Sequence, residues 1–285
     1  MSDPLFQKIA AVWTRTCTGS LSALSSSLIL YMMWSDREFK LKDKPNNRIL
    51  FCMSIVDLVQ SIAYALHTLP LPASSGLYHA IGNSYTCAIQ RFIFQLGLAV
   101  PAYNASLCIW YLMVIKYNMS HTDFARKVEP YCHAYSIFVP LSLACIASAV
   151  DNFQQRNTVC WVDGGPRFSR LFRIFCAVQV LLAFVVILYC LATVYHAIYQ
   201  QEQQMMQYSL SPSGLQWTSS SNVGGLTYIK KKFAAQITLF SFAFIITFLF
   251  PIINIFVPRK AFGALQSLFL PLQGMLYFVM HLILV

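Results

Sequence analysis

The chemically informative residues of this chain are the few charged side chains that lie inside long apolar runs. Asp57 is the only acidic residue within any of these runs. A carboxylate surrounded by hydrocarbon is costly, so Asp57 needs a polar partner or water. We expect it to face neighbouring helices as a polar switch, near Asn254 or Gln273. The alternative is a structural carboxyl that is held by hydrogen bonds.

Two pairs of polar side chains recur at helical spacing near the ends of apolar runs. Arg91 and Gln95 are four residues apart, and Arg170 and Arg173 are three apart, so each pair shares one helix face. Guanidinium groups around one pocket would bind an anionic ligand through bidentate contacts. An equally open alternative is that these arginines reach back to lipid headgroups.

The histidine and cysteine patterns argue against metal and redox chemistry. None of the six histidines forms an i,i+4 pair, and the nine cysteines contain no Cys-x-x-Cys pair, so we expect no metal site and no cofactor. Paired acids are also lacking inside the apolar runs, so we expect no enzyme. The net charge of +10 lies at the ends of apolar runs. This placement suits lipid headgroups rather than nucleic acid.

Seven apolar segments must position these residues. Of the 285 residues, 57% are hydrophobic and 11% are charged, whereas a soluble domain carries about 25% charged residues. We therefore expect an all-α membrane protein, with a single domain over residues 1–285. The expected helices span residues 9–34, 48–71, 87–117, 131–150, 171–199, 233–257 and 262–285. Residues 200–232 are rich in Gln and Ser, and we expect them to form a flexible cytoplasmic loop.

The basic residues near the first helices predict that the amino terminus lies outside the cell. Five of them follow the first helix, and none lies between the second and third helices. Basic loops stay in the cytoplasm, and the first helices usually decide the orientation. The start of the chain does not resemble a signal peptide, so we expect the first helix to target the chain to the plasma membrane. The sequon at Asn118 would then face the cytoplasm and carry no glycan.

Two cysteines lie outside the helix interiors in this topology. Cys87 opens the third helix at its outer end, and Cys160 lies in the second outer loop. Both would face an oxidising compartment, in which a disulfide persists. We expect a bridge that ties this loop over the mouth of the bundle. The alternative is two unpaired thiols.

Several short motifs resemble those of G protein-coupled receptors, and of the cyclic-AMP-receptor-like family in particular. Leu272-Gln273-Gly274 is similar to a signature of the seventh helix in that family, its plant and fungal relatives, and the secretin and adhesion receptors. The other matching motifs are Cys160-Trp161, Pro251-Ile252-Ile253-Asn254, Trp110 with Leu112-Met113-Val114-Ile115, and Ser54-Ile55-Val56-Asp57. The Asp-Arg-Tyr and Asn-Pro-x-x-Tyr motifs of rhodopsin-like receptors are missing.

The resemblance implies a seven-helix receptor of G protein-coupled type. It would bind an extracellular ligand, which the arginines suggest is anionic, and activate a heterotrimeric G protein. Trp161 then joins the candidate ligand-binding residues. The implied switch residues are Asp57, Trp110, Pro251, Asn254, Gln273 and Gly274, and the implied contacts with G protein or lipid are Lys116, Lys230, Lys231 and Lys232.

Two other classes of protein are also built from seven membrane helices. A retinal protein needs a lysine within its last helix, and residues 262–285 contain none. A transporter or channel would need broken helices or a polar path through the membrane, and the runs 131–150 and 233–257 hold no charge. The transporter or channel remains the main alternative.

Overall fold

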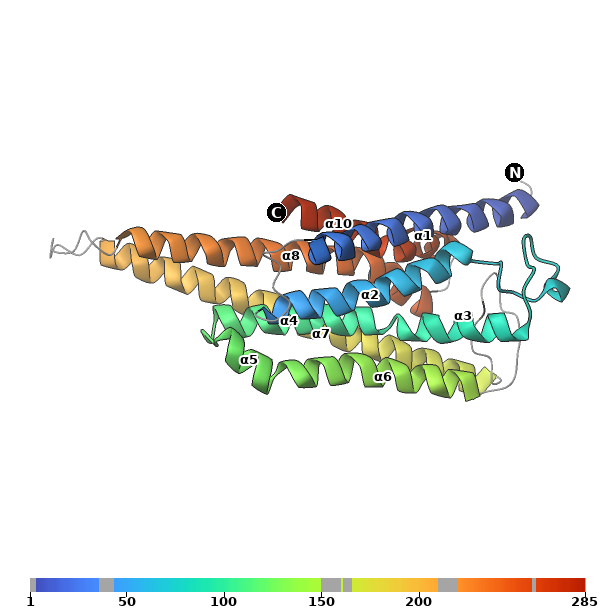
Figure 1. Cartoon of the computed structure of the whole chain (residues 1–285), viewed down its shortest axis with the longest axis horizontal. Coiled ribbons are helices and arrows are strands. Elements are labelled where there is room, and N and C mark those ends of the chain that lie inside the picture. The colour runs from blue at the N-terminus through green and yellow to red at the C-terminus, as the bar shows by residue number, and fades with distance from the viewer. Residues whose placement is uncertain are drawn as a thin grey trace.

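The protein is described by a computed structural model, which is built of helices that run alongside one another (Figure 1). It describes residues 4–35, 44–149, 160, 166–209, 220–257 and 260–284. The helices are α1 (Pro4–Ser35), α2 (Pro45–Leu66), α3 (Ser84–Leu96), α4 (Ala99–Ile115), α5 (His121–Lys127), α6 (Glu129–Ala149), α7 (Pro166–Ser209), α8 (Ser220–Phe256), α9 (Lys260–Phe269) and α10 (Gln273–Leu284). Two short 3₁₀ turns, η1 (Ala73–Ser75) and η2 (Leu270–Leu272), complete the elements.

Seven units of this bundle are long enough to cross a membrane. Within the described ranges, six are also apolar enough by composition: 45–66, 84–115, 129–149, 167–204, 234–254 and 261–280. The seventh unit is α1, which contains many serines and threonines. Three of these serines, Ser22, Ser25 and Ser26, are buried, and α1 packs along α2 and α10. The expected all-α membrane fold with seven helical units is therefore confirmed.

The third unit is broken into α3 and α4 at Gly97 and Leu98. Pro101 lacks an amide hydrogen, and its ring clashes with the carbonyl four residues earlier, which belongs to Gly97. Tighter bonds replace the α-helical ladder here: Leu98 N donates to Gln95 O and Val100 N donates to Gly97 O, each at 3.1 Å. The proline therefore breaks the helix one turn before its own position.

The last unit is also broken, which corrects the expected single helix over 262–285. α9 ends at Phe269, the turn η2 contains Pro271, and α10 starts at Gln273. Pro271 again lacks the amide hydrogen that a continuous helix requires. The break places the Leu-Gln-Gly motif at the start of α10, against α1.

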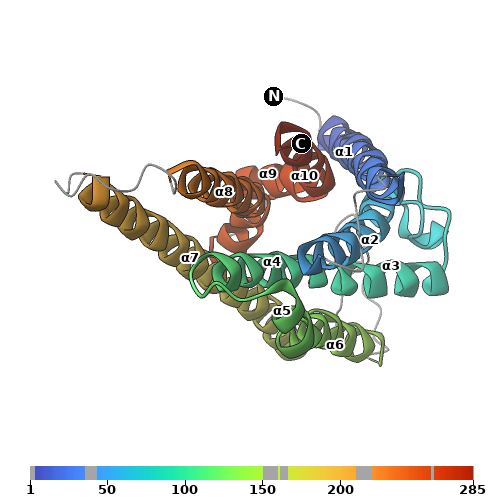
Figure 2. The ribbon, with the colours of Figure 1, turned by 60° about the vertical axis from the view of Figure 1, so that its left-hand side comes forward.

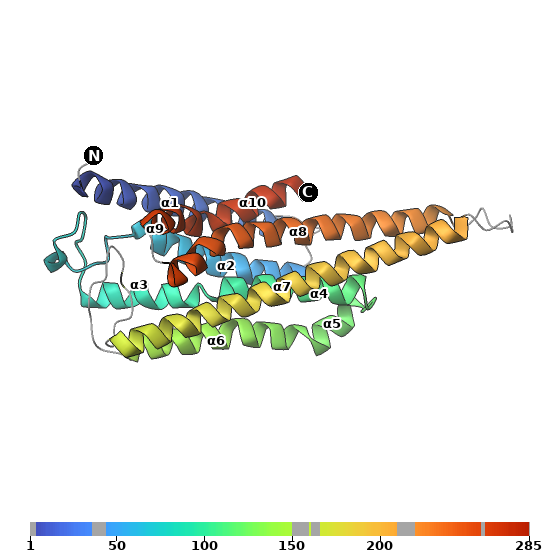
Figure 3. The same ribbon diagram turned by 180° about the vertical axis from the view of Figure 1, so that it is seen from behind.

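The expectation of a loop over residues 200–232 is wrong for most of this stretch. α7 continues to Ser209 and α8 begins at Ser220, so most of this polar stretch is helical. Gln, Glu, Met and Lys have good helix propensity, and a polar composition excludes burial but not helix formation. α7 and α8 lie side by side and extend beyond the other helices (Figures 1 and 3).

α4 occupies the centre of the bundle. It contacts α2, α6, α7 and α8, and it is apolar and buried around most of its circumference, as expected for a central helix. Its aromatic residues Tyr103, Trp110 and Tyr111 are each 1% exposed. They pack in one core with Phe240 and Phe244 of α8.

Candidate functional site

A polar cluster in the middle of the bundle joins α1, α2 and α10. The Asp57 side chain is 3% exposed and accepts a hydrogen bond from the Ser26 hydroxyl. One turn earlier on α1, Ser22 Oγ accepts from Ser61 Oγ and from Gly274 N, each at 2.9 Å. Figure 2 shows α10 lying against α1, where these contacts form. Two serine hydroxyls therefore supply the polar partners that the carboxyl group and α10 require.

Gly274 allows this close approach because it has no side chain. A methyl group at its Cα would overlap Asp57 Oδ2 and Ser26 Oγ, and would lie 2.6 Å from Ser22 Oγ. The backbone of α10 thus rests directly on the polar cluster. The glycine of the Leu-Gln-Gly motif is required here by packing.

Of the other expected switch residues, Gln273 lies at this cluster, whereas Asn254 and Pro251 lie near the end of α8. Gln273 is buried beside the cluster, and its Nε2 donates to Tyr277 OH at 3.0 Å. The expectation that Asn254 approaches Asp57 is wrong, because Asn254 Nδ2 donates to Gln266 Oε1 on α9 at 2.9 Å. Asn254 lies near the end of α8, and α8 packs on α9 and α10 instead of α2. Pro251 lies within α8, one turn before this contact.

Trp110 packs against aromatic rings at the end of α4. Its ring stacks on His121, the first residue of α5, with ring centroids 5.7 Å apart, and meets Tyr111 edge-on at 4.7 Å. Trp110 therefore lies where the end of α4 meets α5. The structure supports a packing role for it at this junction.

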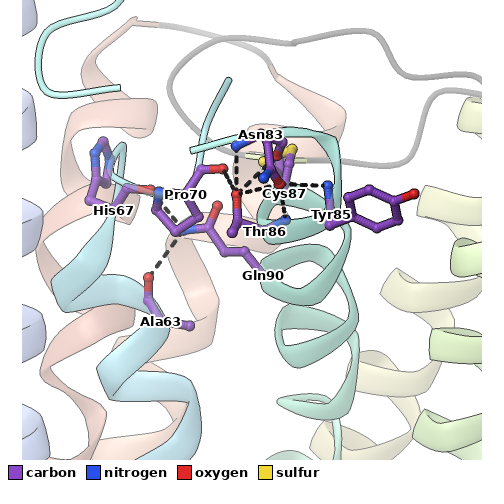
Figure 4. Close-up of a disulfide and its surroundings, with 9 residues drawn as sticks. Ala63, His67, Pro70, Asn83, Tyr85, Thr86, Cys87 and Gln90 are labelled. Atoms are coloured by element: carbon purple, nitrogen blue, oxygen red, sulfur yellow. Dashed lines mark hydrogen bonds between the residues drawn. A yellow bond between two sulfur atoms is a disulfide. The ribbon is translucent and has the colours of Figure 1, made fainter. Parts of the chain in front are cut away.

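The disulfide between Cys87 and Cys160 is present, with the two Cα atoms 5.5 Å apart (Figure 4). We call this end of the bundle the disulfide end. α3 starts here with a capping box, in which the Asn83 side chain accepts from Thr86 N while the Thr86 hydroxyl accepts from Asn83 N. The Thr86 hydroxyl also donates to Pro70 O at 2.7 Å, so it ties α3 to the segment that follows α2.

The three arginines expected around one ligand pocket differ in how deeply they are buried. Arg91 is buried on α3 at 7% exposure, whereas Arg170 is exposed on α7. Arg173 is partly buried, and its Nε donates to Ser169 O at 3.2 Å. The inward face of α7 is formed by Ser169, Phe172 and Cys176, so Arg170 and Arg173 each lie one position away from a residue of that face.

Gln95 of α3 faces α7 in the same region. The Cys176 thiol donates to Gln95 Oε1 at 3.5 Å, and Gln95 Nε2 is buried without a hydrogen-bond partner within the described ranges. Trp161 lies outside the described residues. Arg91 and Gln95 are thus the members of the candidate ligand-binding set that are buried near the disulfide.

Arg15 forms a contact that the sequence analysis missed. Its Nη2 donates to Ser267 Oγ of α9 at 2.6 Å, and its Nη1 lies 3.2 Å from His67 Nε2. Because a guanidinium only donates, His67 Nε2 must be the acceptor and the imidazole proton must lie on Nδ1. Arg15 thus joins α1, the end of α2 and α9. The sequence did offer a signal for this contact, since an arginine inside the first apolar run needs polar partners.

The opposite end of the bundle carries a second missed network. Arg48 at the start of α2 holds Glu129 at the start of α6 in a bidentate ion pair, with Nε to Oε1 at 2.6 Å. Glu129 is 5% exposed. His133 lies 3.3 Å from both Glu129 Oε1 and Tyr103 OH. This chain of contacts links α2, α6 and α4 at the end away from the disulfide.

The basic residues expected to contact a G protein or lipid lie at this same end. Lys116 is exposed just after α4, with its Nζ 5.2 Å from the centroid of the Tyr117 ring. Lys230, Lys231 and Lys232 fall within α8 rather than in a loop, and their side chains lie outside the described residues. Nearby, the hydrogen bond from Ser120 and then the charge of Lys127 lower the pKa of the Asp123 carboxyl group.

Comparisons with known proteins support the fold. No family model matches the sequence, and no curated protein sequence matches it. Solved structures do match, among them the crystal structure of squid rhodopsin, with a TM-score of 0.67 and 13% sequence identity. The match covers 99% of this chain and 84% of the squid rhodopsin chain. At this level of identity the likeness establishes the fold, which is a multi-pass membrane bundle of the rhodopsin type.

Proposed function

We propose that this chain is a G protein-coupled receptor. The observation that carries the proposal is a rhodopsin-type bundle in which a disulfide ties the segment at Cys160 to the start of α3. A disulfide persists in an oxidising compartment, so the disulfide end faces outward and receives the ligand. The opposite end, with Lys116, then faces the cytoplasm and the heterotrimeric G protein.

The ligand would bind near Arg91 and Gln95. Gln95 offers a buried amide nitrogen without a hydrogen-bond partner within the described ranges, and Arg91 lies one turn away on the same helix. A guanidinium and an amide donor together suit an anionic or carbonyl-bearing ligand. The two residues lie one and two turns below Cys87, so such a site would lie next to the disulfide.

Within the receptors, we place the chain in the cyclic-AMP-receptor-like group. Support comes from Leu272-Gln273-Gly274, whose glycine is required by contact with Asp57 and Ser26. An Asp-Arg-Tyr motif is missing after α4, where the chain reads Ile115-Lys116-Tyr117-Asn118. A retinal cofactor is not part of the proposal, because residues 262–285 contain no lysine.

Retention of a G protein by the chain tests the proposal without knowledge of the ligand. Tagged full-length chain is co-expressed with a panel of heterotrimers, the membranes are treated with apyrase to remove nucleotide, and the tag is captured. We expect at least one heterotrimer to be retained and then released by GTPγS. Failure of every heterotrimer to bind, together with uptake of labelled solutes by proteoliposomes, would favour the transporter or channel.

A charge reversal at each end of the bundle tests the proposed polarity. Lys116→Glu should weaken retention severalfold, because the lysine is exposed at the proposed G protein face. Arg170→Glu is the matched control, since it reverses an equally exposed charge near the disulfide end. Equal effects of the two substitutions would contradict the assigned face.

A further inference from the structure

An apolar groove of about 460 Å³ lies between the last turns of α2 and the start of α3, a size suited to one small ligand. Its apolar walls are Ile62, Leu66, Leu69, Ile81, Ile89 and Ile93. Three of these isoleucines are well exposed, with Ile62 at 46%, Ile81 at 76% and Ile89 at 60%. Ile62 and Ile89 belong to membrane-spanning helices, where exposed isoleucines contact lipid. The groove is therefore open toward the bilayer.

The position of the groove along the membrane follows from its neighbours. Tyr78 and Tyr85 are exposed at 44% and 82% at the disulfide end, and tyrosines mark the level of the lipid headgroups. Along α3 the groove runs from Thr86 to Ile93, which is about 10 Å at 1.5 Å per residue. This length covers most of one leaflet, since half of the hydrocarbon core is about 15 Å thick.

One polar side chain that lines the groove, Gln90, has an oxygen atom without a hydrogen-bond donor among the described residues. The Gln90 side chain is 2% exposed. Its Nε2 donates to Ala63 O at 3.2 Å and to His67 O at 2.7 Å (Figure 4). Two carbonyl acceptors fix the orientation of the amide, because the reverse orientation would set oxygen against oxygen. Gln90 Oε1 is left buried without a hydrogen-bond donor among the described residues.

The other polar group of the groove is already satisfied. The Thr86 hydroxyl donates to Pro70 O and accepts from Asn83 N. A buried acceptor without a donor is costly, so a molecule that brings one donor to Gln90 would be stabilised. The surrounding walls require that the rest of this molecule be apolar.

We propose that this groove binds a sterol, that is, a membrane alcohol with a rigid apolar body and one hydroxyl donor. The hydroxyl group would donate to Gln90 Oε1, and the ring system would lie along Ile89 and Ile93. A phospholipid acyl chain fills apolar space but brings no donor to this depth. The proposal rests on the membrane-spanning fold alone and is independent of G protein coupling.

Photolabelling of the full chain in phosphatidylcholine nanodiscs tests the proposal. The probe is a 3-hydroxysterol with a diazirine on its ring system, and labelled peptides are mapped by mass spectrometry. We expect label within residues 62–69 and 81–93. Unlabelled sterol should compete about fivefold better than its 3-O-methyl ether, which cannot donate a hydrogen bond, since that factor is a typical net effect of one bond.

A groove-filling variant provides a second measurement. Ile89→Trp should reduce labelling several-fold, while Ile55→Trp, which enlarges an exposed isoleucine of α2 outside the groove, should leave labelling unchanged. Equal competition by the methyl ether would overturn the role of Gln90. Equal labelling by a diazirine acyl phospholipid that sterol cannot displace would show bulk lipid in the groove and overturn the proposal. Both competition results come from the unaltered chain, so they stand even if Ile89→Trp folds poorly.

Discussion

Replacing Gly274 with alanine tests whether the Asp57 cluster holds α10 in place. The added methyl group would overlap Asp57 Oδ2 and Ser26 Oγ and would approach Ser22 Oγ at 2.6 Å. Overpacking of this kind costs about 1–3 kcal/mol, and separating Ser26 from a buried carboxyl group adds about 1–3 kcal/mol. We therefore expect a loss of about 3 kcal/mol in the free energy of unfolding. For a chain of this size that is roughly a 6–12 °C fall in Tm.

Thermal unfolding can be followed with a thiol-reactive fluorophore, because Cys108, Cys176 and Cys190 are buried in the folded chain. Gly263→Ala is the matched control. A methyl group at Gly263 would meet nothing within 4 Å, so the helix propensity of alanine should leave Tm unchanged or slightly raised. Equal Tm values for Gly274→Ala and Gly263→Ala would refute the packing argument.

A double variant separates steric overlap from lost hydrogen bonding. Ser26→Ala removes one of the atoms that the new methyl group would strike, and it also removes the hydrogen bond to Asp57. The losses of Ser26→Ala and Gly274→Ala should therefore add to more than the loss of the double variant. Strict additivity would mean that the two residues do not compete for the same space.

Three further predictions follow from other parts of the bundle. Glu129→Gln should cost about 1–3 kcal/mol in unfolding free energy, because the partly buried Arg48 side chain loses the charge of its carboxylate partner, while Lys127→Ala in an exposed ion pair should cost less than about 1 kcal/mol. Cys87→Ser should cost about 4 kcal/mol, because the disulfide closes a sequence separation of 73 residues, and Cys145→Ser, at an exposed free thiol, should cost almost nothing. Finally, Asn118 should carry no glycan in expressing cells, so a glycosidase-sensitive mass at this sequon would contradict the proposed orientation.

The membrane fold could be predicted from the sequence because apolar runs must become helices in hydrocarbon. The breaks in those helices were harder to place. A proline disturbs the carbonyl four residues before it, so Pro101 interrupts the unit at Gly97. The polar stretch 200–232 was misjudged as a loop, since its composition excludes a buried core but still favours helix.

The candidate site could be predicted only in part. Asp57 stands out because it is the only acid in an apolar run, and its burial followed from that. Its partners Ser22 and Ser26 could not be predicted, because the sequence does not show which neighbouring helix a serine in a helix faces. The Arg48–Glu129 pair was missed because both residues lie at helix ends, where charges usually meet water.

The paired extension of α7 and α8 has a mechanical consequence. From Ser220 to Pro251, α8 is about 46 Å long at 1.5 Å per residue. A rigid rod of that length converts a ten-degree change of direction at the proline into a displacement of about 8 Å at its far tip. α7 packs against α8, so the two rods must swing together or slide past each other. A small rearrangement at Pro251, close to one end of the span Ala234–Asn254, would thus become a large excursion at the far tip of α8.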